Sequence, residues 1–271
     1  MIQLEWRTAL VTGSSRGIGR GIVHKLVDAG IERVAVNYLA NDAAAHETAE
    51  MLKGKGAEVL LIKADCIDAD QVRGMFDQVK SEFGSLDIFV HNARPNPGTE
   101  PWFASAMEMT AAGLDAAYRS QVHTIVIGCQ ACASLMPNGG RIIGITHAPG
   151  GKTGSWQPWA AMGPAKAALE ATVRYFAVSL ATKGITVNAV SPGVIDDSVI
   201  NSLPTVAYHA IKNWNESGWI PMKRMGTPAD VGNAVALLCA EEASFITGQI
   251  LYVDGGASAM FSEMPLPVQG L

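Results

Sequence analysis

The sequence has few charged residues and no long uninterrupted apolar run. Only 17% of its 271 residues are charged, and the net charge is −5. Nucleic acids and anionic membrane surfaces attract clustered positive charge, so we expect neither as a partner. No run of about 18 or more apolar residues is present, which argues against a spanning helix. The start of the chain has no basic segment followed by an apolar run and a cleavage site, so we expect a cytoplasmic protein.

Cysteine is also scarce, and the four present form no disulfide framework. Cys129 and Cys132 are separated by two residues, a spacing that occurs in metal and redox sites. They lie in the apolar segment Gln121–Met136 without a second pair of ligands. We therefore interpret them as small buried helix residues, and we expect no metal site.

What the chain does contain is apolar residues, at 48%, which is enough to fill a core. Domains usually split beyond roughly 250–300 residues, so we expect residues 1–271 to form one domain. Short β-rich segments alternate with longer helical patterns. The expected strands are Arg7–Val11, Arg33–Tyr38, Glu58–Ile62, Leu86–His91, Arg141–Thr146, Thr186–Val190 and Ile250–Val253. The expected helices are Ile18–Ala29, Ala43–Lys53, Asp70–Phe83, Ala111–Met136 (one long or broken helix), Ala160–Thr182 and Ala229–Ala240.

Near-continuous apolar runs suit strands that are covered on both faces. The alternation therefore predicts an α/β, doubly wound fold with a seven-stranded parallel sheet and helices on both faces. Two segments interrupt it: His91–Met107 is rich in proline and glycine, and Pro192–Met225 is apolar and contains tryptophans. Both follow strands, so we expect both at the carboxyl edge of the sheet, where ligands of such folds bind. We expect residues 194–225 to be a substrate-binding lid.

A glycine-rich turn joins the first strand to the first helix and reads Thr-Gly-Ser-Ser-Arg-Gly-Ile-Gly from Thr12 to Gly19. Glycines let the backbone approach a pyrophosphate, and the helix N-terminus supplies amides and partial positive charge. The turn predicts a dinucleotide site with contacts from Gly13, Ser15, Arg16, Gly17, Ile18 and Gly19.

The end of the second strand indicates which dinucleotide is bound. An acidic residue there would bind the adenosine 2′-hydroxyl and repel a 2′-phosphate. This strand ends in Val36-Asn37-Tyr38 without an acid, and Arg16 can pair with a phosphate. We therefore expect NADP(H), with Asn37 among its contacts.

The spacing Thr-Gly-x-x-x-Gly-x-Gly resembles that of the short-chain dehydrogenase/reductases. The resemblance continues through Asp65-Cys66, Asn92-Ala93 (where Arg94 replaces the family's glycine), Val187–Gly193 and Val253–Gly256. It covers nearly the whole chain and implies a Rossmann fold. It also implies further cofactor contacts from Asp65, Cys66, Asn92, Ala93, Lys166, Pro192, Gly193 and Ile195.

The position of the family's catalytic tyrosine differs in this chain. In typical members the tyrosine lies four residues before a lysine that binds the nicotinamide ribose and lowers the tyrosine pKa. The matching lysine is Lys166, and Met162 stands at the tyrosine position. Residues 162–176 resemble instead the enoyl-acyl-carrier-protein reductase branch, which places its tyrosine seven residues before the lysine. That residue is Trp159, whose indole can donate a hydrogen bond but cannot act as an acid near neutral pH.

Two further catalytic positions also depart from the family. Thr146 or His147 takes the place of the serine at the end of the fifth strand. Gln121 aligns with the helix asparagine that orders a proton-relay water in the family. We predict as catalytic residues Lys166, Trp159, His147, Thr146 and Gln121.

The missing acid favours one type of reaction. Reduction of a ketone creates an alkoxide that must be protonated as it forms, whereas reduction of a C=C bond conjugated to a thioester spreads charge into an enolate. The enolate needs hydrogen-bond donors, and its α-carbon can be protonated later. We therefore expect an NADPH-dependent enoyl-thioester reductase. Its substrate would be an enoyl-CoA or enoyl-carrier protein with an apolar acyl group. Unusual members of the family that reduce cyclic or branched enoyl-CoA substrates would be its relatives. A carbonyl reductase that uses His147 as its acid and a cofactor-binding pseudoenzyme are the alternatives.

Apolar side chains near the site predict the substrate pocket, with Met162, Trp156, Trp214 and Trp219 as its lining. Burial under a lid, or a subunit contact, would explain these side chains equally well. The helical segments Ala111–Met136 and Ala160–Thr182 and the last strand resemble the family's subunit interfaces, so we expect a homotetramer.

Overall fold

One parallel sheet forms the centre of the chain. The computed structural model describes residues 2–95, 104–147, 159–197, 200–202, 204–260 and 266–269. Within these residues the sheet has seven strands in the order β3-β2-β1-β4-β5-β6-β7. The strands are β1 (Thr8–Val11), β2 (Arg33–Tyr38), β3 (Glu58–Lys63), β4 (Ile88–His91), β5 (Gly140–Ile145), β6 (Ile185–Pro192) and β7 (Ile250–Val253). This confirms the expected doubly wound Rossmann fold, whose topological switch point lies between β1 and β4.

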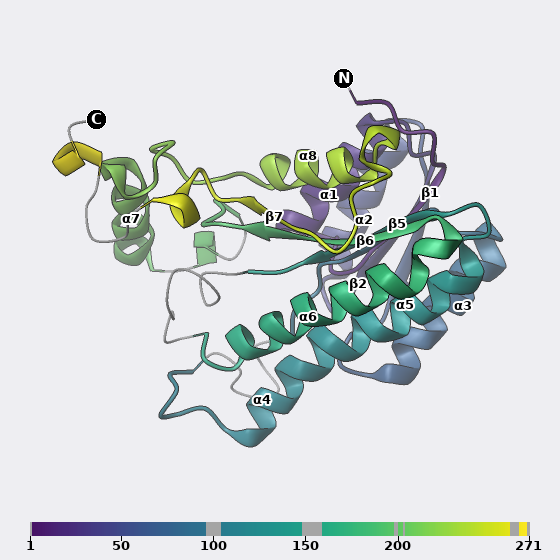
Figure 1. Cartoon of the computed structure of the whole chain (residues 1–271), viewed down its shortest axis with the longest axis horizontal. Coiled ribbons are helices and arrows are strands. Elements are labelled where there is room, and N and C mark those ends of the chain that lie inside the picture. Colours follow the sequence, from purple (N-terminus) through teal and green to yellow (C-terminus); the bar gives the residue numbers. More distant parts are fainter. Residues whose placement is uncertain are drawn as a thin grey trace.

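Helices cover both faces of the sheet (Figure 1). One face carries α1 (Gly17–Asp28), α2 (Asp42–Lys53) and α8 (Pro228–Cys239). The other carries α3 (Ala69–Phe83), α5 (Thr124–Leu135) and α6 (Met162–Leu180). Every residue of β1, β4, β5 and β6 is buried. Successive side chains of a strand enter opposite cores: Leu10 packs in the core beneath α3, α5 and α6, and Val11 in the core beneath α1 and α8. The near-continuous apolar runs of the sequence are the consequence.

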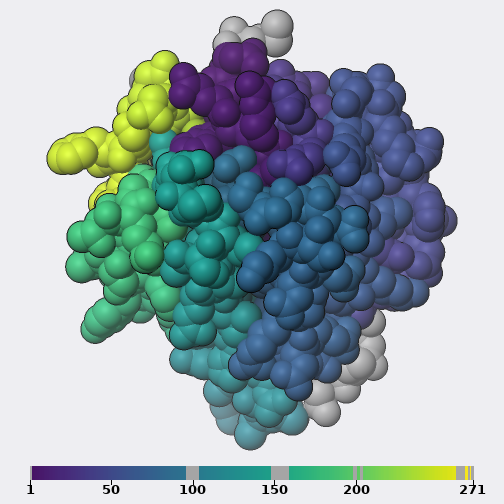
Figure 2. All heavy atoms as spheres, turned by 90° about the vertical axis from the view of Figure 1, so that its right-hand side faces the viewer, coloured from purple at the N-terminus to yellow at the C-terminus, as the bar shows by residue number. Residues whose placement is uncertain are grey.

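The amino edge of the sheet is closed by the N-terminal segment and by the ends of α3 and α5 (Figure 2). Asp87 Oδ2 accepts hydrogen bonds from the backbone nitrogens of Arg7 and Thr8 at 2.9 Å each. Leu86 N donates to Leu135 O at 2.9 Å. In doubly wound folds, ligands bind at the opposite, carboxyl edge of the sheet.

The segment expected as one long or broken helix is helical from Ala111 to Leu135 but changes its winding. It consists of α4 (Ala111–Tyr118), the π-helical turn η1 (Arg119–His123) and α5. A π-turn inside an α-helix shifts the side chains that follow it, and such turns occur often at functional sites. Gln121 lies in this turn. Cys129 and Cys132 are fully buried in α5, where burial raises the pKa of the Cys129 thiol.

The segment 194–225 contains a helix that the sequence pattern did not predict, α7 (Thr205–Trp214), followed by the π-turn η5 (Asn215–Trp219). Figure 1 places α7 beyond one end of the sheet, near the ends of β6 and β7. Within the described ranges, no helix combines the length and apolar character that crossing a bilayer requires. The same ranges contain no cluster of His, Cys, Asp and Glu suited to hold a metal ion.

Candidate active site

The turn between β1 and α1 can be built only from glycines at its key positions. Gly13 and Gly17 have φ angles of +62° and +56°. A Cβ on Gly19 would lie 2.3 Å from Gly13 O and 2.7 Å from Asn92 Nδ2. The backbone of the turn is therefore packed as tightly as backbone atoms allow.

The N-terminus of α1 is open to an anion. Arg16 is the residue before the helix, and no side chain among the described residues caps the first turn. This turn also contains no acidic residue. The unpaired amides and the helix dipole favour a phosphate here. The residues present thus fit the pyrophosphate of a dinucleotide.

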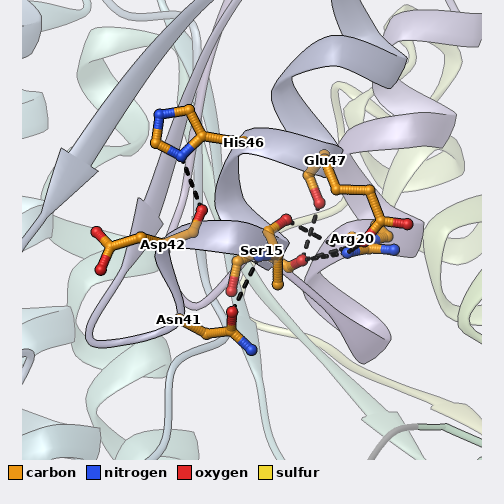
Figure 3. A network of polar contacts seen from close by, with 8 residues as sticks. Ser15, Arg20, Asn41, Asp42, His46 and Glu47 are labelled. Atoms are coloured by element: carbon orange, nitrogen blue, oxygen red, sulfur yellow. Dashed lines mark hydrogen bonds and ion pairs between the residues drawn. The ribbon is translucent and has the colours of Figure 1, made fainter.

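A polar network holds the turn against α2 (Figure 3). Ser15 O accepts hydrogen bonds from Arg20 Nη2 at 2.9 Å and from Thr48 Oγ1 at 2.8 Å. Arg20 also pairs with Glu47 at 2.8 Å. The Arg20 guanidinium is therefore paired with groups of the protein itself. Arg16 is exposed, and no ion pair of its side chain is found within the described ranges, so its guanidinium can serve a ligand.

Asn37 faces the protein interior and supports the turn. It is 1% exposed, and its Oδ1 accepts from Gly13 N at 3.0 Å. Its Nδ2 donates to Ile62 O and Ala64 O. The sequence predicted a cofactor contact for Asn37; in the structure its amide hydrogens bond the backbone at the end of β3, and its amide oxygen bonds the glycine-rich turn.

Asn92 and Ala93 join the end of β4 to the same turn. Asn92 Nδ2 donates to Thr12 O at 3.0 Å and Gly13 O at 3.1 Å. The backbone nitrogens of Asn92 and Ala93 both donate to Thr12 Oγ1. The turn is thereby fixed at the switch point of the sheet.

Asp65 and Cys66 follow β3 at the same edge. Asp65 is partly exposed, and its Oδ1 accepts from Ile67 N at 2.9 Å. Cys66 is 7% exposed, and burial raises the pKa of its thiol to about 12. Its sulfur is therefore a packing group near neutral pH.

The segment after β6 is pinned to its neighbours. Gly193 N donates to Val253 O at 3.0 Å. Ile195 is 5% exposed and pairs with Gly226 in an isolated bridge. Pro192 O points at His147, whose Nδ1 lies 3.1 Å away.

Lys166 lies at the centre of the site, on the first turns of α6. It is 7% exposed, and its Nζ donates to Gln121 Oε1 at 2.6 Å and to Ile145 O at 2.5 Å. Burial lowers the pKa of Lys166 to about 7; the Glu170 carboxylate opposes this shift and Arg94 adds to it. The structure thus brings together two of the predicted catalytic residues, Lys166 and Gln121.

Thr146 and His147 end β5 beside them. Thr146 is 2% exposed, and its Oγ1 donates to Glu170 Oε1 at 2.8 Å. Because a carbonyl oxygen can only accept, the His147–Pro192 contact assigns the proton to His147 Nδ1 and leaves a lone pair on Nε2. Burial lowers the pKa of His147 to about 4, so the ring is neutral near pH 7.

Met162 and Trp159 form the apolar side of the site. Met162 is 1% exposed and packs with Ala117, Ala161 and Ala165, while Trp159 covers this cluster. The rings of Trp159 and His147 are 5.4 Å apart.

Of the other predicted pocket residues, two lie away from Lys166 and Met162, and one lies outside the described residues. Trp214 and Trp219 stack on each other with centroids 4.5 Å apart and planes at 9°. Trp214 is 55% exposed, and within the described ranges this pair has no ring contact with Trp159. Trp156 lies outside the described residues.

Two charged residues of the site were not among the predicted ones. Arg94 is partly buried after β4, where Asp197, Arg16 and Lys166 are close enough to influence titration. In the sequence, Arg94 stands where the family has a glycine, and this departure could have marked it as a residue of the site. Glu170 contacts Thr146. Its place one helical turn after Lys166, on the same face of α6, could have marked it in the sequence.

Comparisons with known proteins match a family, several relatives and solved structures over most of the chain. A family described as Enoyl-(Acyl carrier protein) reductase matches residues 13–258. A 1-cyclohexenylcarbonyl-CoA reductase of Streptomyces collinus is 34% identical, over 93% of this chain and 87% of the relative. A 3-oxoacyl-(acyl-carrier-protein) reductase of Staphylococcus aureus is also 34% identical, over 92% of this chain and 97% of the relative. The crystal structure of the angucycline C-6 ketoreductase LanV with bound NADP superposes with a TM-score of 0.81 at 32% identity, over 94% of this chain and 96% of the other.

Proposed function

The chain belongs to the short-chain dehydrogenase/reductase superfamily, and we propose that it is an NADPH-dependent reductase of the C=C bond of an α,β-unsaturated acyl thioester. The substrate would be an enoyl-CoA or enoyl-carrier protein with an apolar acyl group. The chain's relatives are reductases of acyl thioesters and of ketones, so its assignment as an oxidoreductase rests on the whole set. The choice of the C=C bond rests on the site.

The cofactor proposal follows from the β1–α1 turn. The amides of Gly17, Ile18 and Gly19 would hold the pyrophosphate, and Lys166 the nicotinamide ribose. When bound, NADPH supplies the hydride. Preference for the 2′-phosphorylated form is supported by the exposed Arg16 guanidinium and by the absence of an acid in the sequence at the end of β2.

The observation that carries the proposal is the apolar surrounding of the residue that replaces the tyrosine. Met162 is buried among alanines and offers no proton. A ketone would leave an alkoxide with no acid at the position of the family's tyrosine. An enolate distributes the same charge and needs only hydrogen-bond donors, each often worth about 2.7–4 kcal/mol.

The remaining side chains limit which donors can serve the enolate oxygen. The Thr146 hydroxyl donates its hydrogen bond to Glu170, and His147 Nε2 carries a lone pair, so neither group donates to the enolate oxygen. We assign the stabilisation to the Trp159 indole N–H and to the cofactor ribose held by Lys166. Water would then protonate the α-carbon.

We also propose that residues 194–225 form a lid over the acyl group and that the chain assembles as a homotetramer. Tyr175 and Val178 on α6 are each 79% exposed, which supports a helix-to-helix subunit contact through this surface.

The S. collinus relative, whose name specifies a cyclic enoyl-CoA, supports an apolar ring or branched chain as the acyl group.

A matched pair of substrates tests the proposal. NADPH absorbance is followed with a cyclic or branched enoyl-CoA and with the 3-oxoacyl-CoA of equal chain length. The proposal expects oxidation with the enoyl thioester at least tenfold faster. Faster turnover of the 3-oxoacyl thioester would favour a carbonyl reductase, as the ketoreductase relatives suggest. NADPH binding without turnover of either class would favour a pseudoenzyme.

A further inference from the structure

Gln121 is buried between Lys166 and the end of β4, and both of its amide hydrogens are used. It is 0% exposed. Its Nε2 donates to Ala93 O at 3.0 Å and to Ser120 Oγ at 2.8 Å. Its Oε1 faces the Lys166 ammonium. Turning the amide round would direct N–H groups at the ammonium and an oxygen at Ala93 O, so the contacts fix its orientation.

The ammonium is held from a second side by the protein backbone. Nζ carries three hydrogens. Gln121 Oε1 accepts one at 2.6 Å, and Ile145 O accepts another at 2.5 Å. One hydrogen is left for a ligand.

The π-turn makes this arrangement possible. Arg119–His123 interrupts the regular helix between α4 and α5. Within it, Ser120 Oγ donates to Ala117 O at 3.1 Å and accepts from Gln121 Nε2, so the amide is braced by its own helix as well. The side chain has little freedom to leave Lys166.

We propose that Gln121 is a positioning residue that takes the place of solvent beside Lys166 and leaves this lysine one hydrogen-bond donor for a bound nicotinamide ribose. Lys166 then binds and orients, and the proton that completes the reduction reaches the α-carbon from the substrate side. The proposal rests on the cofactor part of the proposed function and does not depend on which acyl group is reduced.

Few charges face Lys166, so a change at position 121 should be visible in its titration. Glu170 on the same helix favours the ammonium, and Arg94 after β4 opposes it. His91 on β4 and His147 after β5 are near enough to be influenced by Lys166. Burial lowers their pKa values to about 3 and about 4, so both rings are neutral at pH 7.

The test measures the dissociation constant of NADPH against pH by cofactor fluorescence, without acyl substrate. Burial lowers the pKa of Lys166 to about 7, so wild-type affinity should fall as the pH rises through about 7. Gln121→Glu places a carboxylate against the ammonium and should move this midpoint up by about 1–3 pH units. Gln121→Met keeps the length but removes the acceptor, so the midpoint should move down, and affinity at pH 7 should fall by about tenfold or more.

The matched control is Gln130→Glu, the same charge change at an exposed position of α5, which should leave the midpoint in place. A structural role alone would not move the midpoint in opposite directions. Unchanged midpoints in both Gln121 variants, or an equal shift in Gln130→Glu, would overturn the proposal. If the carboxylate prevents folding, the methionine variant and wild type make the comparison. Wild-type protein that binds no NADPH would refute both the cofactor assignment and this inference, whereas binding with unshifted midpoints refutes only this one.

Discussion

His147 Nδ1 lies 3.1 Å from the carbonyl oxygen of Pro192, and this contact decides which ring nitrogen carries the proton. Nε2 is left as an acceptor, and burial lowers the pKa of the ring to about 4. His147 is one of the two residues that can take the family's serine position, yet in this state it cannot donate to an oxyanion. We therefore propose that His147 does not supply the proton of the reaction.

The first prediction follows from this tautomer. In His147→Asn the amide can donate to Pro192 O in the same way, so enoyl reduction should stay within about threefold of wild type, whereas losing a true general acid costs about 10²–10⁴-fold. The folded pKa of about 4 lies below the usual 6.5, so the ring takes up a proton only near pH 4. The pH–rate profiles of the two proteins should therefore coincide between pH 5.5 and 8. A limb near pH 6–7 that disappears in the variant would identify His147 as the acid.

The second prediction concerns the glycine-rich turn. In Gly19→Ala the new Cβ would lie 2.3 Å from Gly13 O, so the turn must shift. NADPH affinity should fall at least tenfold, and stability by about 1–3 kcal/mol. Gly74→Ala in α3 is the control, because nothing lies within 4 Å of its Cβ, and it should gain up to about 1 kcal/mol. Fluorescence titration and urea denaturation measure both quantities. Normal NADPH binding by the Gly19 variant would contradict the role of this turn.

The third prediction concerns cofactor choice. Arg16→Ala should weaken NADPH binding by about 10- to 100-fold, since a hydrogen bond to a charged group contributes about 1.5–3 kcal/mol. The NADH dissociation constant should hardly change, because that cofactor has no 2′-phosphate. Arg73→Ala removes an exposed arginine of α3 and should alter neither constant. Equal losses for both cofactors would place Arg16 at the shared pyrophosphate instead.

The fourth prediction concerns Met162. Restoring the family's tyrosine here should destabilise the fold by about 1–3 kcal/mol, because the side chain is 1% exposed and the new ring overfills the alanine-lined cluster. Met162→Leu, which conserves volume, should cost less than about 1.5 kcal/mol. Denaturant melts separate the two. A tyrosine variant as stable as wild type would mean that this position has room for a phenol facing the site.

The sequence predicted the layers of the fold because alternating apolar segments are a local signal. All seven strands were predicted: β2 and β7 have the predicted boundaries, and the others differ by at most two residues at either end, such as Ile88 in place of Leu86 at the start of β4. The helix α7 was not predicted because its segment was interpreted as an irregular lid; none of its residues is buried in the core, and Val206 is 83% exposed.

The site could be predicted in position but not in orientation. Alignment with the family brought Gln121 and Lys166 to the same region, but their direct contact depends on a π-turn that no local pattern signals. Asn37 was assigned to the cofactor from its place at the end of a strand, whereas the alternation of β2 turns its side chain inward to Gly13 N. The protonation of His147 depends on Pro192, 45 residues away in the sequence.

In the proposed function, this chain reduces a C=C bond without a catalytic tyrosine. The most direct test of this proposal is the position of the label when 4-deuterated NADPH, in each diastereomer, reacts with an apolar cyclic or branched enoyl-CoA and the product is analysed by mass spectrometry. With the diastereomer whose deuterium lies on the transferred face of the nicotinamide, we expect a saturated acyl thioester with one deuterium at the β-carbon, and with the other diastereomer the same product without label. An unchanged enoyl thioester, together with a deuterated carbinol carbon in the product from the matching 3-oxoacyl-CoA, would contradict it.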